Sequence, residues 1–459
     1  MEYISTRNSE KIFFFKDVFL RGLAPDGGLF IPKKIPFYNS QELKKIKSLS
    51  YEELATEILL KFVGDEFSEK EISDIVKNSY KNFRVKNVVK VIKLGNIDLL
   101  ELFHGPTLAF KDIAMQVIGN MYEHILKKYN LKANVVVATS GDTGAAAIDA
   151  IKNRKNIKIF VLHPDKKISD VQRKFMTTVD SNNVFNIALS SNFDECQSFV
   201  KSMFADKNFS NSINMTGVNS INWFRIAIQI VYYFFSYFKI ADGIKKINYS
   251  VPTGNFGDVY AGYIAKKMGL PINKLIIATN ENDILKKVVN SGIYKSSKVV
   301  HTISPSMDIQ IASNFERLIF DVCSQDSKKI SSLMKDFNVR GEYKLEEEEI
   351  KKIKEDFSVE SLSEKETKLI IKDIYFKEKI LIDPHTAVAI GANNKIALTG
   401  KNIILATAHP SKFYNTVVKE TGIKPELPEN LKDILLKKEK YEKLPKDLKV
   451  VQKYILKNI

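Results

Sequence analysis

The segment NVVVATSGDTGAAAIDAIKNRKNIKIFVLH, residues 134–163, decides the fold class. It begins with a short apolar run at 134–138, continues through a small polar loop into a helical pattern at 144–152, and ends in a second apolar run at 157–163. A strand, a helix and a strand this close together predict a compact βαβ unit. Such a unit implies a parallel sheet, because the crossover helix brings the second strand back in the direction of the first.

The same alternation returns twice further along the chain. A strand is expected at 247–251, a helix at 259–267 and another strand at 275–279. The helical pattern HTAVAIGANN, 385–394, is followed by a strand, IILAT, at 403–407. Strands that alternate with helices predict an α/β architecture with at least one doubly wound sheet. Ligands of such sheets bind at the carboxyl ends of the strands.

Length and composition bound the class of protein. The chain has 459 residues, 44% hydrophobic and 27% charged, which is typical of a soluble globular protein with two or three domains. Its longest apolar run, 226–238, is too short to span a bilayer and predicts a buried helix. The first residues carry no secretion signal, and the two cysteines lack metal-ligand spacing. We therefore expect a cytoplasmic protein with reduced thiols and no membrane partner.

The charge balance is strongly basic but not concentrated. Lys and Arg total 70 against 54 acids, a formal net charge of +16. The lysines are mixed with acids along the chain, as in EYKLEEEEIKKIKEDF at 342–357, where a solvated helix face with ion pairs is expected. A general positive field would also attract small anionic substrates, so the charge alone does not indicate a nucleic-acid partner.

One lysine stands at the start of a predicted helix. FHGPTLAFKD, 103–112, places Lys111 in the first turn of a helical pattern that runs to Lys128. A cation is disfavoured there, because the positive end of the helix dipole lies at the N-terminus. Two interpretations stay open from this stretch alone. Lys111 extends to water beside Asp112, or its charged form is disfavoured and its free amine forms a Schiff base with a carbonyl.

Two glycine-containing loops follow predicted strands and lead into helices. The amides of TSGDTGAAA, 139–147, suit a carboxylate or phosphate, although a capped turn would look the same. PTGNFGD, 252–258, is neither a P-loop nor a complete dinucleotide fingerprint. Gly254 and Gly257 would let its backbone approach a single phosphate. A plain strand-to-helix turn is the alternative for this loop.

A third loop, ATAHPSKF at 406–413, places Thr407 at a strand end, where its hydroxyl can bond a ring nitrogen without adding charge. His409 and His385 could be imagined as a metal pair, but no ligand cluster accompanies them, and structural hydrogen bonding is expected instead. Pyridoxal phosphate would use all these parts: a lysine amine, a phosphate cradle and a neutral hydroxyl. The remaining loop is then available for a substrate carboxylate or phosphate.

The motifs HGPTLAFKD, VATSGDTGAAA, PTGNFGD, DPHTAVA and TAHPSKF, in this order, resemble the longer form of threonine synthase that many bacteria and fungi share. YISTRN, LAPDGGLFIP, SINWFRIAIQ and SMDIQIASNFER match the same family, so the resemblance covers nearly the whole chain. It implies a tryptophan synthase beta-like, fold type II pyridoxal-phosphate enzyme. Parallel or mixed sheets with helices on both faces, a large and a small subdomain and an N-terminal helical region are expected. The implied reaction converts O-phosphohomoserine and water to threonine and phosphate, the last step of threonine biosynthesis.

The resemblance also implies roles for individual residues. Lys111 would carry the cofactor as a Schiff base and act as acid and base, and Thr407 would face the pyridine nitrogen. The cofactor-phosphate loop would comprise Gly254, Asn255, Phe256, Gly257 and Asp258. The substrate would meet Ser140, Gly141, Asp142, Thr143, Asn222, Arg225 and Lys412. No metal is expected.

The expected domains are an N-terminal domain at 1–88, a catalytic domain at 89–412 with a mobile subdomain at roughly 115–215, and a lysine-rich helical tail at 413–459. A monomer or homodimer is expected. Two related enzymes stay open as alternatives. A threonine-synthase-like phospholyase that releases 2-oxobutyrate would use the same cofactor residues, whereas the long N-terminal region and the 280–380 insertion argue against a threonine or serine dehydratase. A nucleic-acid-binding protein would leave the three loops unexplained.

Overall fold

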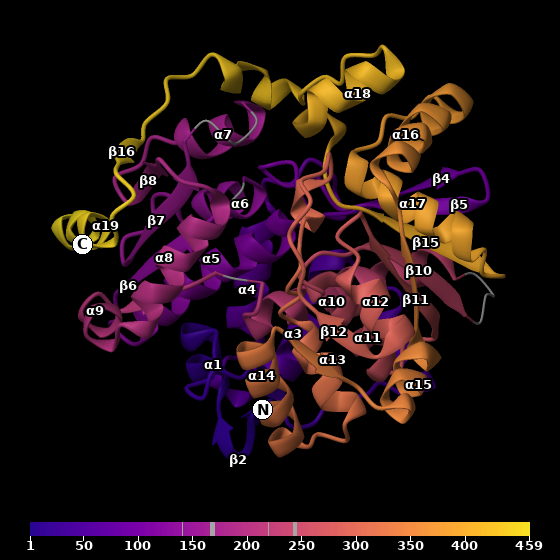
Figure 1. The fold of residues 1–459 in the computed structure, drawn as a ribbon, viewed down its shortest axis with the longest axis horizontal. Helices are drawn as coiled ribbons and strands as arrows, with labels where there is room; N and C mark the ends of the chain where they lie inside the picture. Colours follow the sequence, from indigo (N-terminus) through magenta and orange to yellow (C-terminus); the bar gives the residue numbers. More distant parts are fainter. Residues whose placement is uncertain (140, 166–169, 219, 242–245) are drawn as a thin grey trace.

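The computed structural model describes residues 1–459 except 140, 166–169, 219 and 242–245. Two sheets form the scaffold (Figure 1). The large sheet has the order β14-β11-β10-β15-β5-β4 and is parallel except for the β4–β5 pair. Its strands are β14 (Phe357–Ser361), β11 (Ile272–Thr279), β10 (Ile247–Pro252), β15 (Lys401–Ala406), β5 (Ile97–Glu101) and β4 (Lys90–Leu94). The α/β class predicted from alternating strands and helices is confirmed.

The small sheet is parallel throughout, in the order β16-β8-β7-β6-β9. Its strands are β16 (Glu442–Leu444), β8 (Val184–Leu189), β7 (Ile157–Pro164), β6 (Ala133–Ala138) and β9 (Met215–Thr216). The βαβ unit predicted at 134–163 is formed by β6, the helix α6 (Asp142–Ile151) and β7. Its apolar runs lie in the core because a parallel strand is covered on both faces.

Helices of both sequence halves pack between and around the sheets. The predicted buried helix is α10 (Trp223–Ile240), which packs against α3 (Tyr51–Val63), α5 (Lys111–Lys128) and α11 (Gly257–Lys267). The helix α17 (Pro384–Ile396) covers β10, β11 and β15. Further helices are α7 (Asp170–Thr177), α8 (Phe193–Ala205), α9 (Lys207–Ser212), α12 (Ile284–Ser291), α13 (Phe315–Val322), α14 (Ser327–Arg340), α15 (Glu347–Asp356) and α16 (Glu364–Glu378). A separate two-stranded antiparallel sheet is formed by β12 (Ile293–Lys295) and β13 (Glu342–Lys344).

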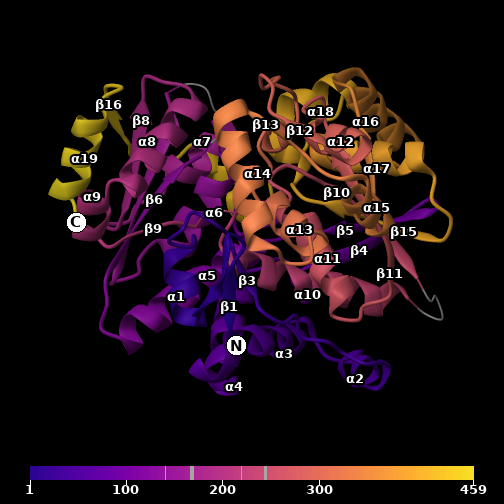
Figure 2. The ribbon, with the colours of Figure 1, turned by 60° about the horizontal axis from the view of Figure 1, so that its bottom comes forward.

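The N-terminal region lies below both sheets in Figure 2. It comprises a β2-β1-β3 sheet and four helices: β1 (Tyr3–Ser5), β2 (Asn8–Phe13), β3 (Phe30–Pro32), α1 (Phe15–Arg21), α2 (Ser40–Ile46), α3 and α4 (Glu69–Tyr80). Arg7 and Thr6 both bond the carboxylate of Glu316, and the buried guanidinium of Arg317 donates to the Phe30 carbonyl at 2.9 Å. This region therefore braces the start of α13.

The lysine-rich C-terminal region differs from the helical tail expected for it. After α18 (Tyr414–Thr421) the chain crosses to the small sheet, where β16 pairs with β8 and α19 (Leu448–Lys457) follows (Figure 1, yellow). Val451 and Ile455 are fully buried in the apolar cluster that contains Phe160 and Leu162. The expectation of helix throughout is thus wrong at β16, and the region completes the core of the small sheet instead of lying at the periphery.

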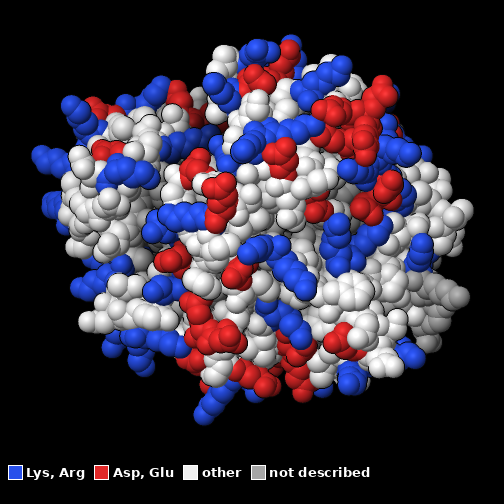
Figure 3. Space-filling model, turned by 90° about the horizontal axis from the view of Figure 1, so that it is seen from below, with Lys and Arg blue, Asp and Glu red and all other residues white. Residues whose placement is uncertain are grey.

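The basic charge is not gathered in one patch on the face drawn in Figure 3. Figure 3 shows Lys and Arg side chains interspersed with Asp and Glu over one face of the molecule. None of the described helices combines the length and apolarity that crossing a bilayer would require.

Candidate active site

A cavity of about 2280 Å³ lies where strands of both sheets end, and several helices begin at its wall. The residues that line it near helix N-termini include Lys111 of α5, Asp142 of α6, Arg225 of α10, Gly257 of α11 and His385 of α17. Helix N-termini carry partial positive charge and unpaired amides, which favour anions. Their convergence makes this cavity suited to ligands with several negative charges.

The loop before α5 holds Lys111 at the cavity. Thr107 donates from its amide and its hydroxyl to the buried carboxylate of Asp112, at 2.7 and 2.5 Å. The Phe110 amide donates to the Thr407 carbonyl at 2.9 Å, which ties the loop to the end of β15. Asp112 is therefore held by hydrogen bonds within the protein. The side chain of Lys111, 11% exposed, faces the cavity and does not extend to the outer surface beside Asp112.

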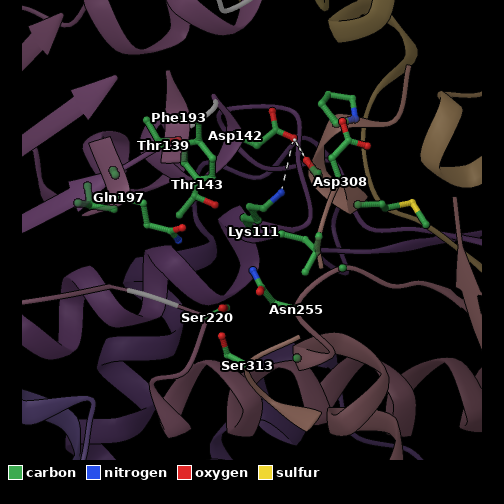
Figure 4. A pocket seen from close by; sticks show the side chains of 18 of the residues that line it. Lys111, Thr139, Asp142, Thr143, Phe193, Gln197, Ser220, Asn255, Asp308 and Ser313 are labelled. Carbon is green, nitrogen blue, oxygen red and sulfur yellow. Dashed lines mark hydrogen bonds and ion pairs between the residues drawn. The ribbon is translucent and has the colours of Figure 1, made fainter. Parts of the chain in front are cut away.

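The amine of Lys111 points toward Asp142, with Asn255 on its other side (Figure 4). Nζ lies 3.6 Å from Oδ2 of Asp142. Burial lowers the pKa of the Lys111 amine, Asp142 opposes that effect, and the charges of Lys412 and Arg225 lower the pKa further. A neutral amine is the form that attacks a carbonyl, so this environment favours the reactive state.

Asp142 binds a second lysine more closely than the first. Its Oδ1 accepts from Nζ of Lys412 at 2.6 Å and from the amide of Gln172 at 3.0 Å. Burial favours the protonated carboxyl, but the two lysines outweigh it and hold the pKa of Asp142 well below its usual range. Asp142 is therefore a buried carboxylate, shared between Lys412 and Lys111.

The loop after β10 forms a tight cradle. Phe256 has a left-handed backbone, φ 65°, immediately before α11 begins. The Asn255 carbonyl accepts from the backbone and side-chain nitrogens of Asn314, at 3.1 and 2.9 Å. A Cβ on Gly254 would lie 2.6 Å from the carbonyl oxygen of Ser306, so only glycine fits at this point. The backbone is thereby held close to the cavity at the start of a helix, where a phosphate would be stabilised.

Asp258, in the first turn of α11, is held by two tyrosines of α10. Its Oδ1 accepts from the hydroxyls of Tyr232 and Tyr233, at 2.5 and 2.9 Å. Burial raises the pKa of this carboxyl to about 6, although the two tyrosines lower it. Asp258 thus fixes the start of α11 to α10, next to the loop whose amides would receive an anion.

We predict that Gly254→Ala weakens cofactor retention. The new Cβ meets a backbone oxygen that cannot rotate away, and overpacking of this kind costs about 1 to 3 kcal/mol. Cofactor affinity should therefore fall on the order of tenfold or more, measured by titrating the apoprotein with pyridoxal phosphate and following its absorbance. Gly257→Ala is the comparison, because its Cβ would lie 3.4 Å from Asn314. An equal loss in both variants would contradict the steric argument.

The loop after β15 brings its predicted residues to the same cavity. Thr407 is buried, and Thr407 and Lys412 both line the wall. His409 begins the short helix η3 (Pro410–Phe413) by accepting from the Ser411 amide at 3.2 Å, and burial lowers the pKa of His409 to about 4. This neutral histidine shapes the turn that carries Lys412, in agreement with the structural role expected for it.

The loop after β6 is closed by a residue that was not among the predicted site residues. The hydroxyl of Thr139 accepts from the amides of Gly141 and Gly144, at 3.0 and 2.9 Å. Thr143 lines the cavity with Asp142, while Ser140 lies outside the described residues. A threonine at a strand end could have been singled out as a cap, because hydroxyls there commonly bond loop amides.

Asn222 and Arg225 lie at the start of α10. Asn222 accepts from the Phe224 amide and donates to the Phe19 carbonyl, both at 3.0 Å, so its side chain is engaged by backbone. Arg225 is buried and donates from Nη1 to the Val218 carbonyl at 3.3 Å, whereas its Nε has no hydrogen-bond partner in the described part of the chain. Burial lowers the pKa of Arg225 to about 10, and the group stays charged at neutral pH. Arg225 is the better placed of the two to receive an anion.

Sequence reasoning also missed the turn opposite the cradle. The helix η2 (Pro305–Met307) is fixed by His385, whose Nε2 accepts from the Ser306 amide at 3.2 Å. Nδ1 of His385 lies 2.7 Å from the Asp383 carboxylate, to which it donates because Nε2 is the acceptor. The Ser306 hydroxyl in turn donates to Asp142 at 3.4 Å. This histidine therefore orients a turn that touches both the cradle and Asp142.

The residues present fit pyridoxal phosphate. A largely buried lysine with a depressed pKa suits its aldehyde, the Gly254 cradle at the start of α11 suits its phosphate, and the Thr407 hydroxyl suits a ring nitrogen. Each element comes from a different strand end of the large sheet or from a helix beside it.

The chain matches the families described as Threonine synthase N terminus at residues 2–80, Pyridoxal-phosphate dependent enzyme at 99–336, and Threonine synthase, C-terminal at 386–455. It is 40% identical to threonine synthase of Pseudomonas aeruginosa, over 99% of this chain and 98% of that protein. It is 41% identical to threonine synthase of Saccharomyces cerevisiae, over 90% and 88%. The pyridoxal-phosphate-bound threonine synthase from Brucella melitensis superposes with a TM-score of 0.96 at 41% identity, covering 100% of this chain and 99% of that one.

Proposed function

Because the chain belongs to the threonine synthase family of pyridoxal-phosphate-dependent lyases, we propose that it converts O-phospho-L-homoserine and water to L-threonine and inorganic phosphate. The observation that carries this proposal is Lys111: a largely buried amine with a lowered pKa, at a cavity where several helices begin. This is the last step of threonine biosynthesis.

The cofactor would be held by three parts of the chain. The amides of the loop Gly254–Asp258 would take its phosphate, Thr407 would face the ring nitrogen, and Lys111 would bond its aldehyde carbon. When bound, pyridoxal phosphate supplies the electron sink that makes the substrate's Cα proton acidic. The phosphate cradle is pre-formed, because Asn314 and the Ser306 turn fix it from both sides.

Lys111 is the group that we propose moves the protons of the reaction. Its Nζ, once free as a neutral amine, can remove the Cα proton and then a Cβ proton of the substrate, so that phosphate leaves from Cγ, and can later return protons to Cγ and to Cα. Water adds at Cβ, which gives threonine. Asp142 lies 3.6 Å from Nζ and can stabilise the ammonium whenever Lys111 carries the proton.

The two anionic groups of the substrate need separate receptors. The loop Gly141–Thr143 at the start of α6 would meet one of them, while Arg225 would bind the other. Guanidinium groups bind phosphate oxygens through two parallel N–H donors, and the Nε of Arg225 is unpaired among the described residues. Asn222 supports this arrangement by fixing the first turn of α10.

The decisive test is product analysis of the purified protein loaded with pyridoxal phosphate and incubated with O-phosphohomoserine. Threonine and inorganic phosphate in equal amounts are expected. Formation of 2-oxobutyrate would instead identify a phospholyase that uses the same cofactor residues, and release of neither product would reject the substrate. We also infer a cytoplasmic enzyme, which is supported by two buried thiols, Cys196 and Cys323.

A further inference from the structure

Lys412 lies closer to Asp142 than binding of a substrate by this lysine would require. Its side chain is fully buried, and Nζ donates to the Thr107 carbonyl at 2.8 Å and to Asp142 Oδ1 at 2.6 Å. Lys111 occupies the other oxygen of the same carboxylate at 3.6 Å. Of the two lysines, the one with no role in bonding the cofactor is the closer partner of Asp142.

The charges around Lys111 come from four different elements. Asp142 of α6 stabilises its ammonium form, while Lys412 of η3 and Arg225 of α10 oppose that form. Asp258 of α11 lies close enough to interact with Lys111 as well, and its carboxyl is held by two tyrosines. Asp142 forms ion pairs with Lys412 and Lys111 among the described residues, so removal of Lys412 would leave only the pair with Lys111. That pair would hold Lys111 in its unreactive charged state.

We propose that Lys412 is a positioning residue: it compensates the charge of Asp142 and so leaves the Lys111 amine free to react, instead of binding the substrate. The proposal rests on the proposed function, in which Lys111 bonds pyridoxal phosphate. In that step the amine nitrogen forms a C=N bond to the aldehyde carbon, and the aldehyde oxygen leaves as water with both amine protons. Only the neutral amine can begin this step, so its rate reports the protonation state of Lys111.

The test measures C=N bond formation and not turnover. The full-length apoprotein is mixed with saturating pyridoxal phosphate, and the first-order rate is followed by absorbance across a range of pH. Lys412→Met is expected to shift the rate profile to higher pH and to slow the reaction about tenfold near neutral pH, because loss of one nearby cation changes the pKa of a neighbour by about one unit or more. Lys412→Arg keeps the charge and should stay close to the wild type.

A second variant separates electrostatics from packing. Asp142→Asn removes the charge that Lys412 compensates, so the profile should shift to lower pH, and Asp142→Asn combined with Lys412→Met should return toward the wild type. A merely structural role would make the double variant the slowest of all. An unshifted Lys412→Met profile would overturn the proposal, and if that variant fails to fold, an unshifted Asp142→Asn profile would do so.

The outcomes also distinguish this inference from the function on which it rests. If the wild type itself forms no C=N bond with pyridoxal phosphate, the assignment of Lys111 fails. If the wild type reacts but the profile of Lys412→Met is unchanged, only the role of Lys412 fails. A raised KM for O-phosphohomoserine with an unchanged profile would return Lys412 to the substrate site.

Discussion

Replacement of Lys111 by alanine is expected to abolish both threonine formation and covalent attachment of the cofactor. The variant loses the only amine proposed to bond the aldehyde and the group proposed to move protons at Cα, Cβ and Cγ. Positioned acid and base groups contribute about 10²- to 10⁴-fold to rates, so kcat should fall by at least about a hundredfold. Product analysis measures the first effect. Borohydride reduction followed by peptide mass spectrometry measures the second.

Lys127→Ala is the matched control, because Lys127 is exposed near the end of the same helix. It should bind the cofactor and turn over as the wild type does. The alternative carrier of the cofactor that this experiment can detect is Lys412, the other lysine beside Asp142. A reduced adduct on Lys412 in the wild type would mean that the two amines around Asp142 have been assigned the wrong way round.

The strands and the loops that follow them could be predicted from the sequence. The strands predicted at 134–138 and 247–251 correspond to β6 and β10 to within one residue at either end, because β-branched and aromatic side chains such as Val135 and Tyr249 favour buried strands. The small polar residues after them then had to lie at the carboxyl edge of a sheet. Local pattern was sufficient here because both the strand and the loop are specified by adjacent residues.

Pairings between distant segments could not be predicted in this way. Lys412 and Asp142 are far apart in the chain, and neither segment contains a signal for the other, although they meet at 2.6 Å. The same holds for β16, whose three residues Glu442–Leu444 are mostly charged and become a strand only because the edge of β8 is available to them. Composition favoured a solvated helix there, and tertiary context decided otherwise.

Residue type alone also left the roles of polar side chains at helix starts undecided. Asn222 was a candidate for substrate binding, and its side chain caps α10. Capping and ligand binding draw on the same residues, because both require a polar group at the helix N-terminus. Only the hydrogen-bond partners of each group separate the two uses, which is why Arg225, with an unpaired Nε among the described residues, is distinguished from its neighbour.

Arg225→Met is expected to lower kcat/KM for O-phosphohomoserine about a hundredfold, mainly through KM. A buried guanidinium in the first turn of α10 opposes the helix dipole, and a bound phosphate would compensate both charges. Loss of such a charge-assisted pair costs about 2 to 5 kcal/mol. Because Arg225 also lowers the pKa of Lys111, kinetics should be compared on the alkaline plateau of the pH profile.

Arg225→Lys separates charge from geometry in this prediction. The ammonium retains the positive charge but not the two parallel donors, so an intermediate loss is expected if a phosphate is bound in a bidentate manner. Inhibition by inorganic phosphate should weaken in the same order, whereas affinity for pyridoxal phosphate should stay constant in both variants. If cofactor affinity falls while KM is unchanged, the anion at Arg225 is the phosphate of the cofactor, and the substrate must be held by the loop at the start of α6.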